Sequence, residues 1–152
     1  MGRLDITQLT KTFDEGENVI VAVDELDIAV EDGEFLVLVG PSGCGKSTTL
    51  RCIAGLERVT SGRIRLDGRD ITDAKPKNRD MAMVFQNYAL YPHMTVRGNI
   101  GYGLQITTDL SKPETNDRVD DHAALLALPD LLEKKPKELS GGQQQRVALG
   151  RA

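Results

Sequence analysis

The amino-acid sequence predicts a mixed α/β fold, and three patterns along its 152 residues carry that prediction. Alternating apolar and polar positions over 3–30 are typical of antiparallel β-structure. An apolar run of strand length at 34–39 then enters a glycine-rich loop, and helical spacing of apolar residues follows over 49–54. Over 97–136 the sequence changes to helical patterns separated by breaks, which predicts a distinct helical part.

The glycine-rich loop at 40–48 matches the full pattern of a nucleotide-binding P-loop. Its glycines let backbone N–H groups come close around phosphates, toward which the next helix points its partial positive end. Lys46 adds a full positive charge, and Ser47 supplies a hydroxyl for a phosphate-bound Mg²⁺. A glycine-rich turn between an ordinary strand and helix is the alternative, which both flanks disfavour. The nucleotide-binding residues predicted here are Gly40, Pro41, Ser42, Gly43, Cys44, Gly45, Lys46, Ser47 and Thr48.

Further β-structure is predicted after this helix. Asp67-Gly68 is a strong hairpin turn signal between the short apolar-polar segments 63–66 and 69–71. A polar connection at 75–79 then leads to 81–85, which has the pattern of a buried strand.

The helical part is predicted in two pieces. A first helix covers 98–104, and a polar stretch at 107–116, which contains Pro113, interrupts the pattern. A single apolar stripe over 119–126 then marks a second helix, which ends before Pro129.

The segment 139–151 reads Leu-Ser-Gly-Gly-Gln-Gln-Gln-Arg-Val-Ala-Leu-Gly-Arg and resembles the signature sequence of the ATP-binding cassette (ABC) family. Ser140 is a good helix N-cap, and the N–H groups of Gly141 and Gly142 can be approached closely, so the segment predicts a second helix start that attracts phosphate. The alternative is an ordinary Ser-Gly-Gly turn that opens a surface helix.

Two more segments resemble loops of the same family. The segment 81–96 is similar to the glutamine loop, and the resemblance implies that Gln86 contacts Mg²⁺ and water and senses a membrane partner. The segment 9–13 is similar to the adenine-stacking loop and places Phe13 at the aromatic position, where a flat face suits a purine.

Asp24 and Glu25 end an apolar run but are rejected as catalytic residues. In the family, the strand that ends in a Mg²⁺-binding aspartate and a catalytic glutamate follows the signature helix, whereas this run precedes the P-loop. We therefore expect both to lie on the surface of the antiparallel region. The family's acidic strand and switch histidine are expected to be missing from these 152 residues.

The resemblance implies a P-loop NTPase cassette with an N-terminal antiparallel β region, a RecA-like core and a helical subdomain. Residues 1–152 would form a partial ATP-binding domain. In it, 1–96 make the β region and the P-loop core, 97–140 the helical subdomain, and 139–152 the signature motif and its helix.

The resemblance also implies the ATP-binding subunit of an importer, most similar to the sugar importers of the maltose and glycerol-phosphate type. Importers of polyamine, iron or sulfate have close variants. ATP and Mg²⁺ are the implied cofactors, with Lys46 and Gln86 catalytic and Ser47 and Gln86 at the metal. A head-to-tail dimer, or a paired cassette subunit, would cap each ATP with the partner's signature, and integral membrane permease subunits would hold the protein at the inner face of the membrane. The capping residues are Ser140, Gly141, Gly142 and Gln143.

This chain by itself is expected to be poorly folded, because in the family the strands after the signature lie beside the P-loop strand in the central sheet. It is expected to be inactive in ATP hydrolysis for a separate reason, because the family's water-orienting acidic residue is missing from it. A non-hydrolysing fragment or a pseudogene product is the alternative.

Composition excludes some other classes. With 39% hydrophobic and 28% charged residues the chain is ordinary for a globular protein, and its net charge of -4 argues against a nucleic-acid binder. A spanning helix needs about 18 apolar residues, which no segment approaches, and a signal peptide is not predicted, so we expect a cytoplasmic location. Cys44 and Cys52 would lie about 12 Å apart on a helix, beyond the reach of about 7 Å of a disulfide, so both are expected to be free.

Overall fold

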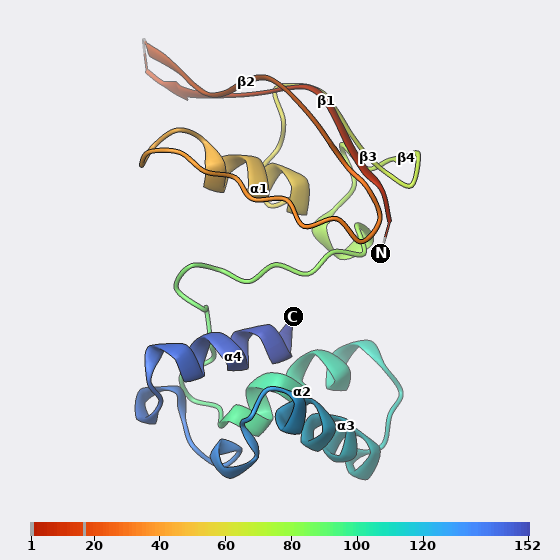
Figure 1. The fold of residues 1–152 in the computed structure, drawn as a ribbon, viewed down its shortest axis with the longest axis vertical. Helices are drawn as coiled ribbons and strands as arrows, with labels where there is room; N and C mark the ends of the chain where they lie inside the picture. Colours follow the sequence, from red (N-terminus) through yellow and green to blue (C-terminus); the bar gives the residue numbers. More distant parts are fainter. Residues whose placement is uncertain (1, 17) are drawn as a thin grey trace. The chain divides into compact units, whose positions relative to one another are not determined.

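The computed structural model describes residues 2–16 and 18–152, and the chain divides into two compact units, Met1–Met81 and Ala82–Ala152. Figure 1 shows the sheet and α1 (Lys46–Ala54) in the first unit, and helices α2 (Val96–Thr107), α3 (Lys112–Leu125) and α4 (Gly141–Arg151) in the second.

The first unit is built on a four-stranded sheet in the order β2-β1-β3-β4. The strands are β1 (Leu4–Glu15), β2 (Asn18–Val30), β3 (Ser61–Leu66) and β4 (Arg69–Asp70), and every neighbouring pair is antiparallel. The antiparallel region predicted from the sequence is therefore confirmed. The predicted hairpin is confirmed too: Asp67 and Gly68 have φ values of 51° and 75°, as a two-residue turn between β3 and β4 requires.

The core of the first unit lies between this sheet and α1. Cys52 of α1 belongs to one buried cluster with side chains of β1, β2 and β3. The buried members are Ile6, Leu9, Val23, Cys52, Ile64 and Ile71. Because apolar burial is the main favourable term in folding, these contacts fix α1 against the sheet.

The strands predicted at 34–39 and 81–85 are not formed, which corrects the sequence analysis. Both segments run as irregular backbone, and within residues 2–16 and 18–152 neither joins the sheet. The side chains of Phe35 and Val39 are 89% and 88% exposed. A strand needs a neighbouring strand to satisfy its backbone N–H and C=O groups. An apolar run without such a neighbour therefore does not form a strand, even where its sequence pattern is strong.

The second unit consists of three helices and short 3₁₀ turns, η2 (Pro129–Leu131) and η3 (Pro136–Glu138). The helices predicted at 98–104 and 119–126 are confirmed in type, but their starts differ. Thr95 caps α2 by accepting a hydrogen bond from Gly98 N, and a Ser111–Glu114 capping box starts α3 inside the stretch that the sequence reads as a break. Pro113 is compatible with this start because the first helical turn needs no N–H donor from it.

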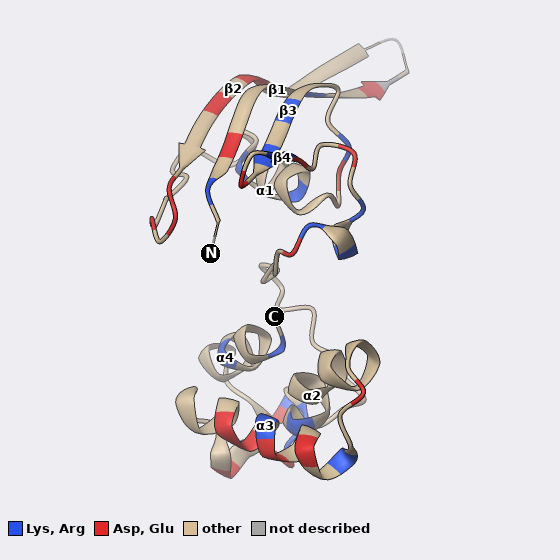
Figure 2. Ribbon diagram, turned by 90° about the vertical axis from the view of Figure 1, so that its right-hand side faces the viewer, with Lys and Arg blue, Asp and Glu red and all other residues tan. Residues whose placement is uncertain are grey.

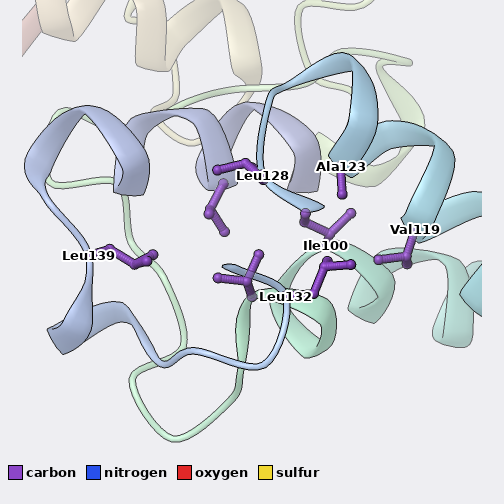
Figure 3. Packing of buried hydrophobic residues seen from close by; sticks show 8 residues of the cluster. Ile100, Val119, Ala123, Leu128, Leu132 and Leu139 are labelled. Atoms are coloured by element: carbon purple, nitrogen blue, oxygen red, sulfur yellow. The ribbon is translucent and has the colours of Figure 1, made fainter. Parts of the chain in front are cut away.

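A cluster of side chains from α2, α3, α4 and the connection after α3 forms the core of the second unit, and Figure 3 shows its side chains directed toward one another. The buried members are Val96, Ile100, Val119, Ala123, Leu128, Leu132, Leu139 and Val147. Asn99, also fully buried, accepts a hydrogen bond from Tyr91 N at 2.8 Å and donates to the carbonyl oxygens of Tyr91 and Thr95. It thereby fastens the loop before α2 to that helix.

Acidic residues are prominent along α3 (Figure 2), where Glu114, Asp117, Asp120 and Asp121 are exposed. Arg97 of α2 joins this surface to the connection after α3, through ion pairs with Asp120 at 2.9 Å and Glu133 at 3.1 Å. In the part of the chain that the structure describes, no helix is long and apolar enough to cross a membrane.

Candidate functional site

The glycine-rich loop of the first unit has the backbone geometry that its sequence predicts. Gly43 and Gly45 have φ values of 84° and 87°, in the left-handed region that favours glycine. A Cβ added at Gly45 would come within 2.1 Å of Ala22 O, so the loop also packs closely on β2 at this point. Both glycines are therefore required for the loop to follow this path into α1.

Lys46 closes the loop with its ammonium group. Its Nζ donates to Gly40 O at 2.7 Å and to Pro41 O at 2.6 Å, and it lies 3.4 Å from Cys44 Sγ. An ammonium group has three donors, and sulfur is a weak acceptor, so a stronger acceptor such as a phosphate oxygen could replace the thiol. The loop thus holds a positive charge beside the start of α1.

The start of α1 is open to an anion. Gly45 is the N-cap, and among the described residues no side chain caps this helix and no acidic residue lies in its first turn. First-turn N–H groups and the helix dipole attract negative charge when nothing else satisfies them.

The hydroxyl groups near this helix start differ in their partners. Thr49 is buried and its Oγ1 donates to Gly45 O at 3.0 Å, whereas Ser47 is exposed and, among the described residues, forms no side-chain hydrogen bond. Oxygen ligands suit Mg²⁺, so the Ser47 hydroxyl has the chemistry that a metal on a bound triphosphate needs.

Phe13 lies on β1 of the same unit, with 37% of the residue exposed. Lys11 Nζ lies 4.5 Å from the ring centroid and also forms an ion pair with Glu57 at 2.8 Å. The sequence analysis did not single out Lys11, although residues two apart on a strand share a face and could have indicated this contact. The predicted adenine-stacking ring is thus a partly exposed aromatic group beside a cation.

The predicted signature segment forms a helix start in the second unit. Ser140 is the N-cap of α4: it accepts a hydrogen bond from Gln143 N, and its own N–H donates to Gln143 Oε1 at 2.8 Å. This capping box confirms the helix start predicted from the sequence.

The two glycines that follow are not needed by the fold. Neither Gly141 nor Gly142 has a positive φ. Among the described residues, a Cβ added at Gly141 would meet only Tyr88 Oη, at 4.0 Å, and one added at Gly142 would meet no atom within 4 Å. They leave the start of α4 open to close approach from outside.

Gln86 lies in an exposed turn directly after the irregular segment 81–85, and not at the end of a strand as predicted. The turn closes where Tyr88 N donates to Phe85 O at 2.9 Å. Tyr88 and Ala89 then have φ values of 58° and 47°.

Arg151 holds the end of this loop against α4. Its Nη1 donates to Ala89 O at 2.5 Å, and its guanidinium carbon lies 5.2 Å from the Tyr91 ring centroid. The structure therefore brings the loop after Gln86 and the helix of the signature segment together in one unit. The sequence analysis missed Arg151, because nothing local links it to a loop 62 residues away.

Several other sequence expectations can be compared with the structure. Asp24 and Glu25 are exposed on β2, which agrees with their rejection as catalytic residues. Cys44 is exposed and Cys52 buried, and both are free, as predicted. Cys44 precedes α1, so the two are not on one helix. Burial raises the pKa of the Cys52 thiol. Within the described residues, no group of three or more His, Cys, Asp or Glu side chains could hold a metal ion.

The glycine-rich loop, in which Lys46 donates to carbonyl oxygens of the loop and after which a helix starts without a side-chain cap, has the features of a P-loop protein. The family model described as ABC transporter matches residues 23–152. The chain belongs to the ABC transporter family.

Similar proteins agree with this assignment. The chain is 57% identical to the xylose/arabinose import ATP-binding protein XacK of Haloferax volcanii over 153 aligned positions, which cover 100% of this chain and 40% of that protein. It is 53% identical to the oligosaccharides import ATP-binding protein MsmX of Bacillus subtilis, covering 100% of this chain and 40% of that one. The chain thus spans about 40% of the length of these curated relatives.

A solved structure is similar as well. It is described as a dimeric, post-hydrolysis state of the ATP-binding cassette MJ0796 bound to ADP and Pi, with a TM-score of 0.86 and 32% sequence identity. The match covers 97% of this chain and 68% of that chain. The predicted α/β cassette fold is confirmed by this similarity.

Proposed function

We propose that this chain provides the nucleotide-binding part of the ATP-binding subunit of a sugar importer. The observation that carries the proposal is the loop in which the Lys46 ammonium spans two carbonyl oxygens beside the open start of α1. A triphosphate is the ligand that a full positive charge, first-turn N–H groups and a nearby hydroxyl suit together. Phe13 on β1 would stack on the adenine.

Mg²⁺ is the metal that fits these residues, because the Ser47 hydroxyl is a hard oxygen donor that is exposed at the loop. Gln86 would be the second protein contact, by resemblance to the family. Bound with ATP, the metal would neutralise charge on the β- and γ-phosphates. Lys46 would hold the γ-phosphate, and the first-turn N–H groups of α1 would orient the phosphate chain for in-line attack by water.

We also propose that Ser140, Gly141, Gly142 and Gln143 cap the ATP of a partner cassette. Support comes from Gly141 and Gly142 at the start of α4. Neither has a positive φ, and a Cβ added at either would make no close contact with a described residue, so the fold itself does not require glycine there. Permease subunits in the membrane would be the other partners, and the protein would lie at the inner face of the membrane. The domains would be 1–96 for the β region and P-loop core, 97–140 for the helical subdomain, and 139–152 for the signature.

Sugars are the proposed class of solute. The support is that similar proteins are named for import of xylose and arabinose, of oligosaccharides and of diacetylchitobiose. Others are named for sn-glycerol-3-phosphate. ATP hydrolysis would drive uptake through nucleotide-dependent pairing of two cassettes.

Replacing the loop lysine tests the nucleotide site. Charge-assisted hydrogen bonds contribute about 1.5–3 kcal/mol each, so Lys46→Ala in the whole protein should weaken Mg-ATP binding by at least about tenfold in titration calorimetry. The matched control is Lys77→Ala, which removes an exposed lysine of η1 (Pro76–Asn78) and should leave binding unchanged. Equal ATP affinity in the Lys46→Ala variant would refute the proposed site.

A further inference from the structure

Arg79 is a buried cation in the first unit, with 3% of the residue exposed. It donates from Nη1 to Cys52 O and Ile53 O, both at 2.8 Å, from Nη2 to Thr72 O at 2.7 Å, and from Nε to Ala74 O at 2.9 Å. A guanidinium has five N–H donors in a planar fork, so these contacts use nearly all of its capacity. Burial lowers the pKa of the Arg79 guanidinium, and the nearby Asp73 carboxylate acts in the opposite direction.

Two of these acceptors, Cys52 O and Ile53 O, lie in the last turn of α1, where carbonyl oxygens lack the usual i+4 donor, although Cys52 O also accepts from Gly55 N at 3.1 Å. A positive charge at a helix C-terminus is also favourable toward the helix dipole. Gly55 ends the helix with φ 74°, and a Cβ added there would come within 2.4 Å of Arg79 Nε. Glycine at this position therefore leaves the space through which the guanidinium reaches the helix end.

The other acceptors connect Arg79 to the sheet. Thr72, whose carbonyl oxygen accepts from Arg79, accepts a hydrogen bond from Ile64 N of β3 with its side-chain Oγ1 at 2.9 Å. One guanidinium thus joins α1 to the segment that is bonded to β3, and β3 pairs with β1. Apolar packing between α1 and the sheet is non-directional, whereas these bonds fix orientation.

The opposite end of α1 is the phosphate-binding loop, and β1 carries Phe13. A helix behaves as a stiff rod of about 1.5 Å per residue, so fixing its C-terminal end relative to the sheet also fixes the loop relative to Phe13. We propose that Arg79 is a positioning residue that sets the spacing between the phosphate-binding loop on α1 and the adenine-stacking ring on β1. This inference rests on the proposed nucleotide site and adds a residue outside it.

Two ligands separate positioning from general stability, namely Mg-ATP, which needs both the loop and the ring, and Mg-tripolyphosphate, which needs the loop alone. Arg79→Lys keeps the charge but loses the planar fork. In the whole protein it should weaken Mg-ATP binding about tenfold, the size of an aromatic contact, and change Mg-tripolyphosphate binding by less than about twofold. Arg69→Lys, at an exposed arginine of β4, is the matched control and should change neither.

A second variant reaches the same contact from the helix side. Gly55→Ala should displace the guanidinium and produce the same selective loss of ATP affinity. Its control is Gly68→Ala, which has the same strain at φ 75° but no described atom within 4 Å of the added Cβ. If the Arg79→Lys variant shows no cooperative melting transition, the ATP and tripolyphosphate affinities of Gly55→Ala test the inference in its place.

The outcomes are distinct. If a folded variant binds both ligands more weakly by the same factor, or binds both as tightly as the unaltered protein, Arg79 does not set the spacing between the loop and Phe13. In either case the inference is wrong. If the unaltered protein binds neither ligand, the proposed nucleotide site itself fails.

Discussion

The two compact units differ in how many of their apolar residues find partners inside the unit. In the second unit, eight buried side chains from the three helices and their connections close one core (Figure 3). The first unit has a core between sheet and α1, but it leaves Phe35, Val37 and Val39 exposed. Helices satisfy their own backbone groups and need only a packed face, whereas a strand also needs a neighbour. Among the described residues, the second unit therefore leaves fewer large apolar side chains exposed than the first, although Ile106 and Leu125 are exposed there as well.

The units also differ in how arginine side chains bind the carbonyl oxygens at the C-terminal ends of their helices. In the second unit Arg146 of α4 donates to Leu126 O at 2.9 Å and Ala127 O at 3.1 Å, at the end of α3. In the first unit Arg79 serves the end of α1 but is almost fully buried and reaches two further carbonyl oxygens. Removing a buried cation leaves several acceptors without donors, so the first unit depends more on a single side chain.

The largest effect should come from the closed core. Leu128 is fully buried, and Leu128→Ala should lower the free energy of unfolding of the helical unit by about 2–5 kcal/mol, measured by urea unfolding followed by circular dichroism. Phe35→Ser, at a residue 89% exposed, should change stability by no more than about 0.5 kcal/mol. A loss at Phe35 as large as that at Leu128 would mean that the run 34–39 is packed, and the contrast between the units would be wrong.

The same contrast explains which elements could be predicted from the sequence. The α1 and α4 helices, the antiparallel region and the Asp67-Gly68 turn depend on local signals, and all four are confirmed. The predictions of strands at 34–39 and 81–85 were wrong. An apolar run indicates that a segment tends to be buried, whereas strand pairing depends on segments elsewhere in the chain.

Some local signals were present and missed. Ser111 and Glu114 have the spacing of a capping box, and Pro113 is typical of a first helical turn, yet this stretch was interpreted as a break. Arg79 and Arg151 had no such signal. Their partners are backbone carbonyl oxygens brought close only by the folded chain, 26 or 27 residues from Arg79 in α1 and 62 residues from Arg151.

A smaller effect should separate the two helix starts, since α4 is capped by its own sequence and α1 is not. Ser140→Ala should destabilise the helical unit by about 1 kcal/mol, the usual contribution of an N-cap. Gln143→Ala removes the other half of the same box, so the double variant should cost less than the sum of the two single variants. Additive losses in urea unfolding would show that the two side chains do not act as a box.

The smallest effect should be a dependence on pH at α3 that α4 lacks. The side chain of Ser111 donates to Glu114 Oε2, as does its backbone N–H at 2.8 Å, and these bonds lower the pKa of the Glu114 carboxyl below its ordinary value of 4.5. A carboxylate with a lowered pKa stabilises the fold at pH values above 4.5, and this contribution is lost as the pH falls through the lowered value. The first turn of α3 should then open in acid, seen as faster amide hydrogen exchange of Thr115, whose N–H donates to Ser111 O. Glu114→Gln should remove the pH dependence. The start of α4 should show none, because its box uses the uncharged Gln143, and equal acid sensitivity at both helix starts would contradict this assignment.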